Sequence, residues 1–378
     1  MLHRIGDIYA ERSERGAADM ELLSVTMNDG VMQRSEIEGK DNSSEDKSNY
    51  KVVRKGDMVY NSMRMWQGAN GVSPYDGIVS PAYTVLTAKL PICNDYFAAL
   101  FKNYKLINEF RKNSQGMTSD TWNLKYPQIE TIKVYLPVIE EQEKIASILV
   151  TLDKRIAAQA ALVEQLKKYK RGVISALLSS KTNPYYSPET WKEVALCDVA
   201  SGFEYGMNAA ATVYDGSHKY IRITDIDDNS HLYSQDVPVS PEGQVDEKYR
   251  VRENDILFAR TGASVGKSYR YQRSDGDLYY AGFLIRIHVN SDVNCGYVFQ
   301  NTLTEAYRRW VLLESARSGQ PGINAEQYKQ YRFLLPPLEL QNKISTLATN
   351  LDNLICKEEN LLSQIEQVKI ALLQRLFI

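Results

Sequence analysis

The chain has 378 residues, a formal net charge of −2 and a hydrophobic content of 43%. This length predicts two or more domains, and the composition is that of a globular protein with no membrane span, secretory leader or polycationic surface. The four cysteines and four histidines are scattered, which argues against a metal site and favours reduced thiols in the cytoplasm.

Residues 1–135 show the mixed patterning of a small α/β domain. Strand-like runs begin at Asp57 and Ala82, and a helix-like stretch covers 97–111. Two loops combine glycine with polar and basic residues: "NSMRMWQGANGVS" from Asn61 and "RKNSQGMTSDTW" from Arg111. Side chains of these types contact bases and phosphates. We therefore predict DNA contacts by Asn61, Arg64, Gln67, Asn70, Arg111, Ser114 and Gln115.

Residues 136–180 are predicted to form one long helix. Apolar side chains recur in alternating steps of four and three from Ile145 to Leu177, which is typical of a coiled-coil seam. A helix of about forty residues, at about 1.5 Å per residue, is a rod of about 60 Å. A turn-forming linker, 181–188, follows it. The alternative is an amphipathic helix packed only on its own domain.

Residues 189–334 are predicted to form a second α/β domain, with strand-like runs at Lys219, Asp255 and Gly282 and a helix-like stretch at 297–313. Its loop "ARTGASVGKS", 259–268, is one residue too short for a phosphate-cradling P-loop. We interpret it as a basic hairpin, either DNA-binding or simply solvated. With the later loop "SARSGQPGIN", it predicts DNA contacts by Arg260, Thr261, Ser264, Lys267, Arg317, Ser318 and Gln320.

The segment from Leu136 is repeated from Leu335, so that residues 335–378 form a second long helix. The order is domain, helix, domain, helix. Short connections predict an antiparallel helix pair that separates two similar domains, related by a pseudo-two-fold axis. The fold class is therefore α+β. Such a pair of unlike but homologous domains suits a split, asymmetric DNA site, and a scaffold joining two protein-binding domains is the alternative.

Two further motifs bear on catalysis. The tetrapeptide "NPYY" at 183–186 is close to an amino-methyltransferase signature, but it lacks the second proline and lies in the linker. The acidic run "DIDD" at 225–228 lacks a nuclease-like partner and is interpreted as a solvated turn. We therefore expect no catalytic centre and no metal site in this chain.

The doubled "LP…EQ/LQ-x-KI" helix start, the "RTGASVGK" loop and "GIVSPAYTVL" from Gly77 resemble the specificity subunit of type I restriction–modification systems. The resemblance covers essentially the whole chain. It implies two target recognition domains that read the two halves of a bipartite site in double-stranded DNA. The two helices would be the spacer. When Asp7 is aligned with Asp198, the first domain is several residues shorter at its start than the second. Two explanations stay open: a start placed too late, or a recombined version of this half.

The resemblance also implies partners. Two methyltransferase subunits and ATP-using restriction subunits would assemble with this non-catalytic chain. S-adenosylmethionine, ATP and Mg would then bind only to those partners. The positions expected to dock the methyltransferase subunits lie at the two helix starts: Gln142, Lys144, Gln341 and Lys343.

Overall fold

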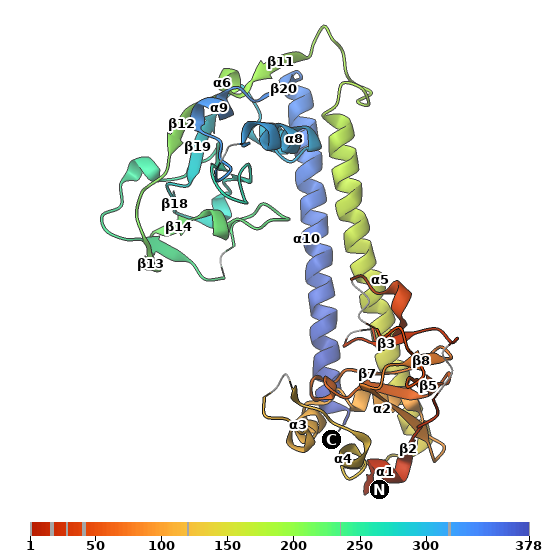
Figure 1. Cartoon of the computed structure of the whole chain (residues 1–378). Coiled ribbons are helices and arrows are strands. Elements are labelled where there is room, and N and C mark those ends of the chain that lie inside the picture. Colours follow the sequence, from red (N-terminus) through yellow and green to blue (C-terminus); the bar gives the residue numbers. More distant parts are fainter. Residues whose placement is uncertain are drawn as a thin grey trace. The chain divides into compact units, whose positions relative to one another are not determined.

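A computed structural model describes residues 2–15, 19–27, 29–39, 43–118, 121–234, 236–316 and 319–377. The chain divides into two compact units. The first unit is Met1–Ala161 with Glu359–Ile378, and the second is Leu162–Glu358. Each unit contains one mixed helix-and-strand domain and part of both long helices, which confirms the predicted α+β class (Figure 1).

The first unit is built on a four-stranded antiparallel sheet in the order β2-β9-β6-β7. Its strands are β1 (Leu2–Arg4), β2 (Tyr9–Glu11), β3 (Leu23–Val25), β4 (Val31–Gln33), β5 (Lys51–Val53), β6 (Met58–Asn61), β7 (Asn70–Val72), β8 (Gly77–Val79), β9 (Tyr83–Ala88) and β10 (Lys133–Tyr135). Its short helices are α1 (Ile5–Ile8), α2 (Asn94–Leu100), α3 (Tyr104–Asn113) and α4 (Tyr126–Ile129).

The second unit repeats this plan with a sheet in the order β12-β19-β16-β17. Its strands are β11 (Lys192–Ala195), β12 (Ala200–Tyr205), β13 (Ala211–Val213), β14 (Lys219–Ile221), β15 (Val239–Pro241), β16 (Asp255–Ala259), β17 (Ser268–Arg270), β18 (Leu278–Tyr280), β19 (Leu284–Val289) and β20 (Arg332–Leu335). Its short helices are α6 (Leu196–Val199), α7 (Cys295–Asn301), α8 (Glu305–Glu314) and α9 (Ala325–Lys329).

The internal repeat extends to individual turns. At the start of β6 the carboxylate of Asp57 accepts the backbone N–H of Arg54 at 2.8 Å, and Asp255 accepts that of Arg252 at 2.8 Å before β16. Gly56 (φ 92°) and Asn254 (φ 68°) occupy the equivalent left-handed position, which glycine and asparagine tolerate best. The loose sequence match between these two segments therefore reflects the same local fold.

Each helix-like stretch beside the long helices is two short helices, not one. In the first unit Asn103 interrupts the chain between α2 and α3, and its side chain accepts the N–H of Lys105. Thr304 caps α8 at the equivalent place in the second unit. A side-chain oxygen that accepts a hydrogen bond from a free N–H group caps the start of a new helix. The apolar periodicity in the sequence therefore continues through the turn between two helices.

The two long helices are α5 (Ile139–Leu177) and α10 (Leu338–Arg375), lying within the segments predicted for them. All their predicted seam positions, from Ile145 to Leu177 and from Ile344 to Leu376, are buried or half-buried. Among the described residues, no helix has the length and apolar character needed to cross a bilayer.

The ion pairs between the two long helices show that the helices run in opposite directions. In the first unit Asp153 of α5 pairs with Lys369 of α10, and in the second unit Lys170 of α5 pairs with Asp352 at 2.5 Å. The early part of each helix thus meets the late part of the other. The repeat converts one pair into the other, because Asp153 corresponds to Asp352 and Lys170 to Lys369. The polar seam lysines are therefore neutralised within the helix pair.

A buried glutamine joins each long helix to its domain. The Gln142 side chain, 2% exposed, accepts the N–H of Cys93 at 3.0 Å and donates to the carbonyl of Pro137 at 2.9 Å. Gln341, also 2% exposed, accepts the N–H of Asn294 at 2.9 Å and donates to Pro336 at 2.7 Å.

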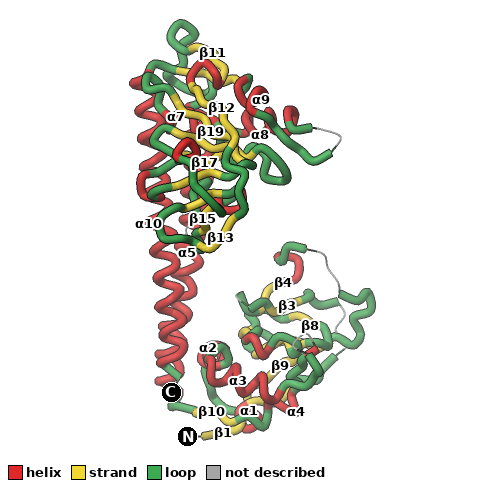
Figure 2. Tube along the Cα trace, turned by 90° about the vertical axis from the view of Figure 1, so that its left-hand side faces the viewer, coloured by secondary structure: helices red, strands yellow, loops and turns green. Residues whose placement is uncertain are grey.

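The prediction that these glutamines dock a partner is therefore corrected. Their side chains lie inside the chain with both amide atoms satisfied, whereas Lys144 and Lys343 are exposed. Apolar contacts continue the same junction. Tyr96 and Phe97 of α2 share a core cluster with Ile145 and Leu149 of α5, and α7 packs with Ile344 in the second unit. Figure 2 shows α7 on the side of the strands that faces α10.

Replacement of either glutamine is expected to loosen its own unit. Gln142→Ala leaves the partly buried N–H of Cys93 without its acceptor, which costs about 1–3 kcal/mol in unfolding free energy. Gln341→Ala removes the equivalent bonds in the second unit. The control is Gln165→Ala, an exposed position of α5, expected within about 0.5 kcal/mol of wild type. Equal denaturation midpoints for all three variants would contradict this role.

Candidate nucleic-acid interface

In the second unit the two predicted DNA-binding loops form one surface. The first, residues 260–267, joins β16 to β17, and the second, residues 315–323, follows α8. The N–H of Gly262 donates to the carbonyl of Pro321 at 3.0 Å, and the N–H of Ile323 donates to that of Arg260 at 2.9 Å. A Cβ on Gly262 would lie 3.2 Å from Nε2 of Gln320. Arg317 and Ser318 lie outside the described residues.

Arg260 is the arginine at the centre of this surface. Its guanidinium carbon lies 4.7 Å from the centroid of the Tyr205 ring, at the end of β12. Thr261 and Ser264 are half-buried beside it, and Gln320 is exposed. These four side chains are thus brought together as predicted partners of DNA, although their contacts with DNA stay a prediction.

Lys267 differs from the expectation of a free phosphate contact. Its ammonium pairs with Asp228 and donates to the carbonyl of Ile226 at 3.0 Å, and only 11% of its side chain is exposed. The Asp228 carboxylate therefore already neutralises the Lys267 ammonium in the absence of any phosphate. This pairing also argues against a nucleotide-binding loop. Tertiary contact, not spacing along the chain, decides this, because Asp228 lies 39 positions upstream.

The acidic run that supplies Asp228 is a folded turn. Asp225 pairs with Arg222 at 2.7 Å, and Asp227 accepts the N–H groups of Asn229 and Ser230 at 3.0 and 2.7 Å. Backbone hydrogen bonds from Ser230 and Asn229 lower the pKa of Asp227. Each carboxylate thus has a structural partner, and the described part of the chain holds no cluster of three potential metal ligands.

In the first unit the corresponding loops, residues 61–69 and 114–124, also meet. The N–H of Leu124 donates to the carbonyl of Ser62 at 2.8 Å, and Gln115 pairs with Asn123 through two backbone hydrogen bonds of 3.0 and 2.8 Å. Trp66 of the first loop packs edge to face against Trp122 of the second, with centroids 5.3 Å apart.

The predicted residues of the first unit differ in their accessibility. Arg111 is exposed and lies 5.5 Å from the Trp66 ring, while Arg64 and Gln115 are exposed at the rim. Gln67 is half-buried. These residues remain candidates for DNA contact.

Three other predicted residues are tied into the fold. Asn61 caps its own turn by accepting the N–H of Met63 at 3.0 Å, and the Ser114 hydroxyl donates to the carbonyl of Phe110 at 2.7 Å. Asn70 is a correction, because it begins β7 opposite Tyr60 and is only 1% exposed. A residue buried in a sheet cannot reach a base edge.

Two aromatic residues, one on the loop surface of each unit, were missed from the sequence. Trp122 and Tyr205 lie far along the chain from the loops that they contact, and Tyr205 reads as an ordinary strand residue. Trp122 is the last residue of the loop segment that begins at Arg111, and Tyr205 is marked only by its place at the end of a strand.

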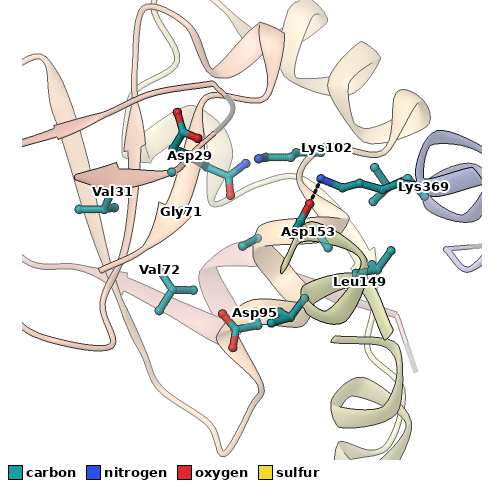
Figure 3. A pocket seen from close by; sticks show the side chains of 15 residues that line it. Asp29, Val31, Gly71, Val72, Asp95, Lys102, Leu149, Asp153 and Lys369 are labelled. Atoms are coloured by element: carbon teal, nitrogen blue, oxygen red, sulfur yellow. Dashed lines mark hydrogen bonds and ion pairs between the residues drawn. The ribbon is translucent and has the colours of Figure 1, made fainter. Parts of the chain in front are cut away.

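A polar cavity of about 200 Å³ lies in the first unit between its domain and the long helices (Figure 3). Lys102, Asp153 and Lys369 line it, and Figure 3 shows the ammonium group of Lys369 directed to the carboxylate of Asp153. Burial and the charge of Lys369 lower the pKa of Lys102. Asn70 is the only predicted DNA-binding residue in its lining.

The chain is similar to known proteins of one family. The family described as "Type I restriction modification DNA specificity domain" matches residues 19–168 and 188–367. The type I restriction enzyme StySPI specificity subunit of Salmonella potsdam is 23% identical over 303 residues, which cover 76% of this chain and 65% of that protein. The MjaVIII specificity subunit of Methanocaldococcus jannaschii is 24% identical over 342 residues, covering 84% and 77%.

The fold is shared with a solved structure. A type I restriction–modification S subunit from M. genitalium matches with a TM-score of 0.62 and 15% identity, covering 100% of this chain and 96% of that one. The match to the StySPI subunit spans somewhat less than two thirds of that protein's length.

The Lys267–Asp228 pair predicts opposite effects of two substitutions on nucleic-acid binding. Asp228→Asn removes the competing carboxylate, so binding is expected to strengthen and its salt slope to steepen by about one. Lys267→Ala is expected to weaken binding. The control is Asp292→Asn, an exposed position between β19 and α7. Binding titrations of the full chain in its complex, over a range of salt, test this. If both variants bind nucleic acid more weakly, the Lys267–Asp228 pair only stabilises the fold and does not compete with phosphate.

The charges around this cavity predict that removal of the Lys102 charge stabilises the protein, by an amount that depends on pH. Because the pKa of Lys102 is lowered in the folded state, wild-type stability rises as pH increases from that lowered value towards the ordinary one. Lys102→Met keeps the aliphatic stem, so we expect a higher melting temperature at neutral pH and a loss of this rise. The control is Lys105→Met at an exposed position. Melting curves at several pH values that coincide for Lys102→Met and the control would contradict it.

Proposed function

Since the chain belongs to the family of type I restriction modification DNA specificity proteins, we propose that it is the subunit that recognises the DNA sequence in a type I restriction–modification complex. Each unit reads one half of a bipartite, asymmetric target. The observation that carries this proposal is the repeated joining of two polar, basic loops into one surface in each unit. Loops on a rigid scaffold are where sequence-reading side chains are placed.

The chain is proposed to carry no catalytic centre of its own. Its relatives are described as specificity subunits, and the polar groups of its loop surfaces are arginine, glutamine and hydroxyl side chains. These groups suit base and phosphate contacts. S-adenosylmethionine, ATP and Mg would bind to the partner subunits, in the cytoplasm.

Two methyltransferase subunits are proposed to dock at the helix starts, with restriction subunits joining the complex. Lys144 and Lys343 support this, because both are exposed next to the buried glutamines. The helix pair would set the spacing between the two half-sites. A scaffold for two protein partners has less support, since it leaves the shared loop chemistry of the two units unexplained.

Domain exchange tests the proposal. Residues 1–135 are replaced by the corresponding domain of a relative, and methylated motifs are mapped across the genome in cells that carry the complete system. One half of the motif is expected to change and the other to stay. The control is a strain without the gene, in which the motif should vanish. A motif that changes in both halves, or in neither, would refute the assignment of one half-site to each unit.

A further inference from the structure

Ser62 and Arg260 occupy the same backbone position in the two units. The N–H of Ser62 donates to the carbonyl of Ala82 at 3.0 Å, and the N–H of Arg260 donates to that of Phe283 at 3.0 Å. Their carbonyls accept from Leu124 and Ile323 at 2.8 and 2.9 Å, respectively. Four backbone hydrogen bonds thus fix equivalent Cα positions, from which one unit presents an arginine and the other a serine.

The serine does not reach the surface. Ser62 is 4% exposed, and its hydroxyl lies 2.8 Å from that of Thr84. The first unit instead presents Arg111, from the last turn of α3, beside Trp66. The equivalent position of α8 is Leu312, which is 71% exposed. The loop surface of each unit therefore presents one arginine over an aromatic ring, but from a different element.

The rings that carry these arginines are themselves held. The N–H of Ala325 donates to the Tyr205 hydroxyl at 3.2 Å, and Tyr205 is paired with Ile285 in the sheet. Trp66 donates its indole N–H to the carbonyl of Met63 at 3.0 Å and packs on Trp122. A fixed ring restricts a stacked guanidinium in orientation before any ligand binds, which reduces the cost of ordering it.

Stacking also leaves the hydrogen-bonding edge of the arginine available. Within the described residues, neither Arg260 nor Arg111 has a carboxylate within 4.0 Å. Arg250, Arg273 and Arg286, in contrast, are paired with Asp277, Glu253 and Glu204, respectively. A planar guanidinium with free N–H groups matches the two acceptors of guanine in the major groove.

We propose that Arg260 and Arg111 each read one guanine, in different half-sites, and that Tyr205 and Trp66 are the positioning residues that orient them. This inference rests on the proposed function. It adds the base, the two arginines and the reason why the half-sites differ, since the arginines project from non-equivalent elements.

The test compares ring-removing with ring-keeping variants in the complete complex. Arg260→Ala is expected to reduce discrimination at one guanine of one half-site by roughly 5- to 150-fold. Tyr205→Leu should relax the same position by roughly 2- to 5-fold, and Tyr205→Phe, which keeps the ring and loses only the hydrogen bond from Ala325, should relax it by less. Arg111→Ala and Trp66→Leu should relax a guanine in the other half-site, with a smaller effect for Trp66→Phe, which keeps an aromatic ring. The readout is methylation rate on DNA with each position substituted.

Phe203→Leu is the matched control for strand β12. Phe203 lies two residues before Tyr205 under Lys329, not under a loop arginine, so its loss should leave discrimination unchanged. The inference would be overturned if the arginine variants lost discrimination at a base other than guanine, or showed no loss at all. Equal effects of Tyr205→Phe and Tyr205→Leu would also overturn it. Loss of the one-half-per-unit rule in the domain exchange would instead overturn the proposed function.

Discussion

The buried glutamine at the start of each long helix is the constraint on which each unit depends. Gln142 and Gln341 accept the N–H that precedes the short helix of the domain and donate to a proline carbonyl ahead of the long helix. An unpaired buried amide is costly, so this junction has one geometry. The core around α2 or α7 then packs the sheet against the long helix, and the sheet in turn sets the positions of the loops at its strand ends. The hydrogen bonds of one glutamine therefore help to position a loop surface that lies far from that glutamine along the chain.

The repeat preserves this framework and changes what the framework presents. The sheet order, the carboxylate-capped turns before β6 and β16, and the backbone bonds of Ser62 and Arg260 are the same in both units. The side chains at these equivalent positions differ, because Ser62 is buried and Arg260 lies on the loop surface. Since the backbone bonds do not depend on side-chain identity, a unit can exchange a serine for an arginine without losing the loop geometry. This separates stability from recognition in physical terms.

Fewer basic side chains are available on the loop surfaces than the composition indicates. Many basic residues near the second hairpin are neutralised by carboxylates, as Arg250 is by Asp277 and Lys267 is by Asp228. Arg260 is stacked on a ring instead. A chain with a net charge of −2 can in this way offer a few oriented donors instead of a broad positive field. Such donors favour discrimination between sequences over general attraction to DNA.

Sequence alone determined the two long helices, their seam and the duplication, because heptad spacing and a gap-free repeat are properties of the chain itself. It also located the four loops, since glycine and polar residues between apolar runs mark turns. Only the tertiary structure decided which residues of those loops are available. It buried Asn70 in a strand, closed Gln142 and Gln341 inside the helix junctions, and paired Lys267 with Asp228. It also placed Tyr205 under Arg260. These outcomes depend on contacts between segments far apart in sequence, which no local pattern of residue types encodes.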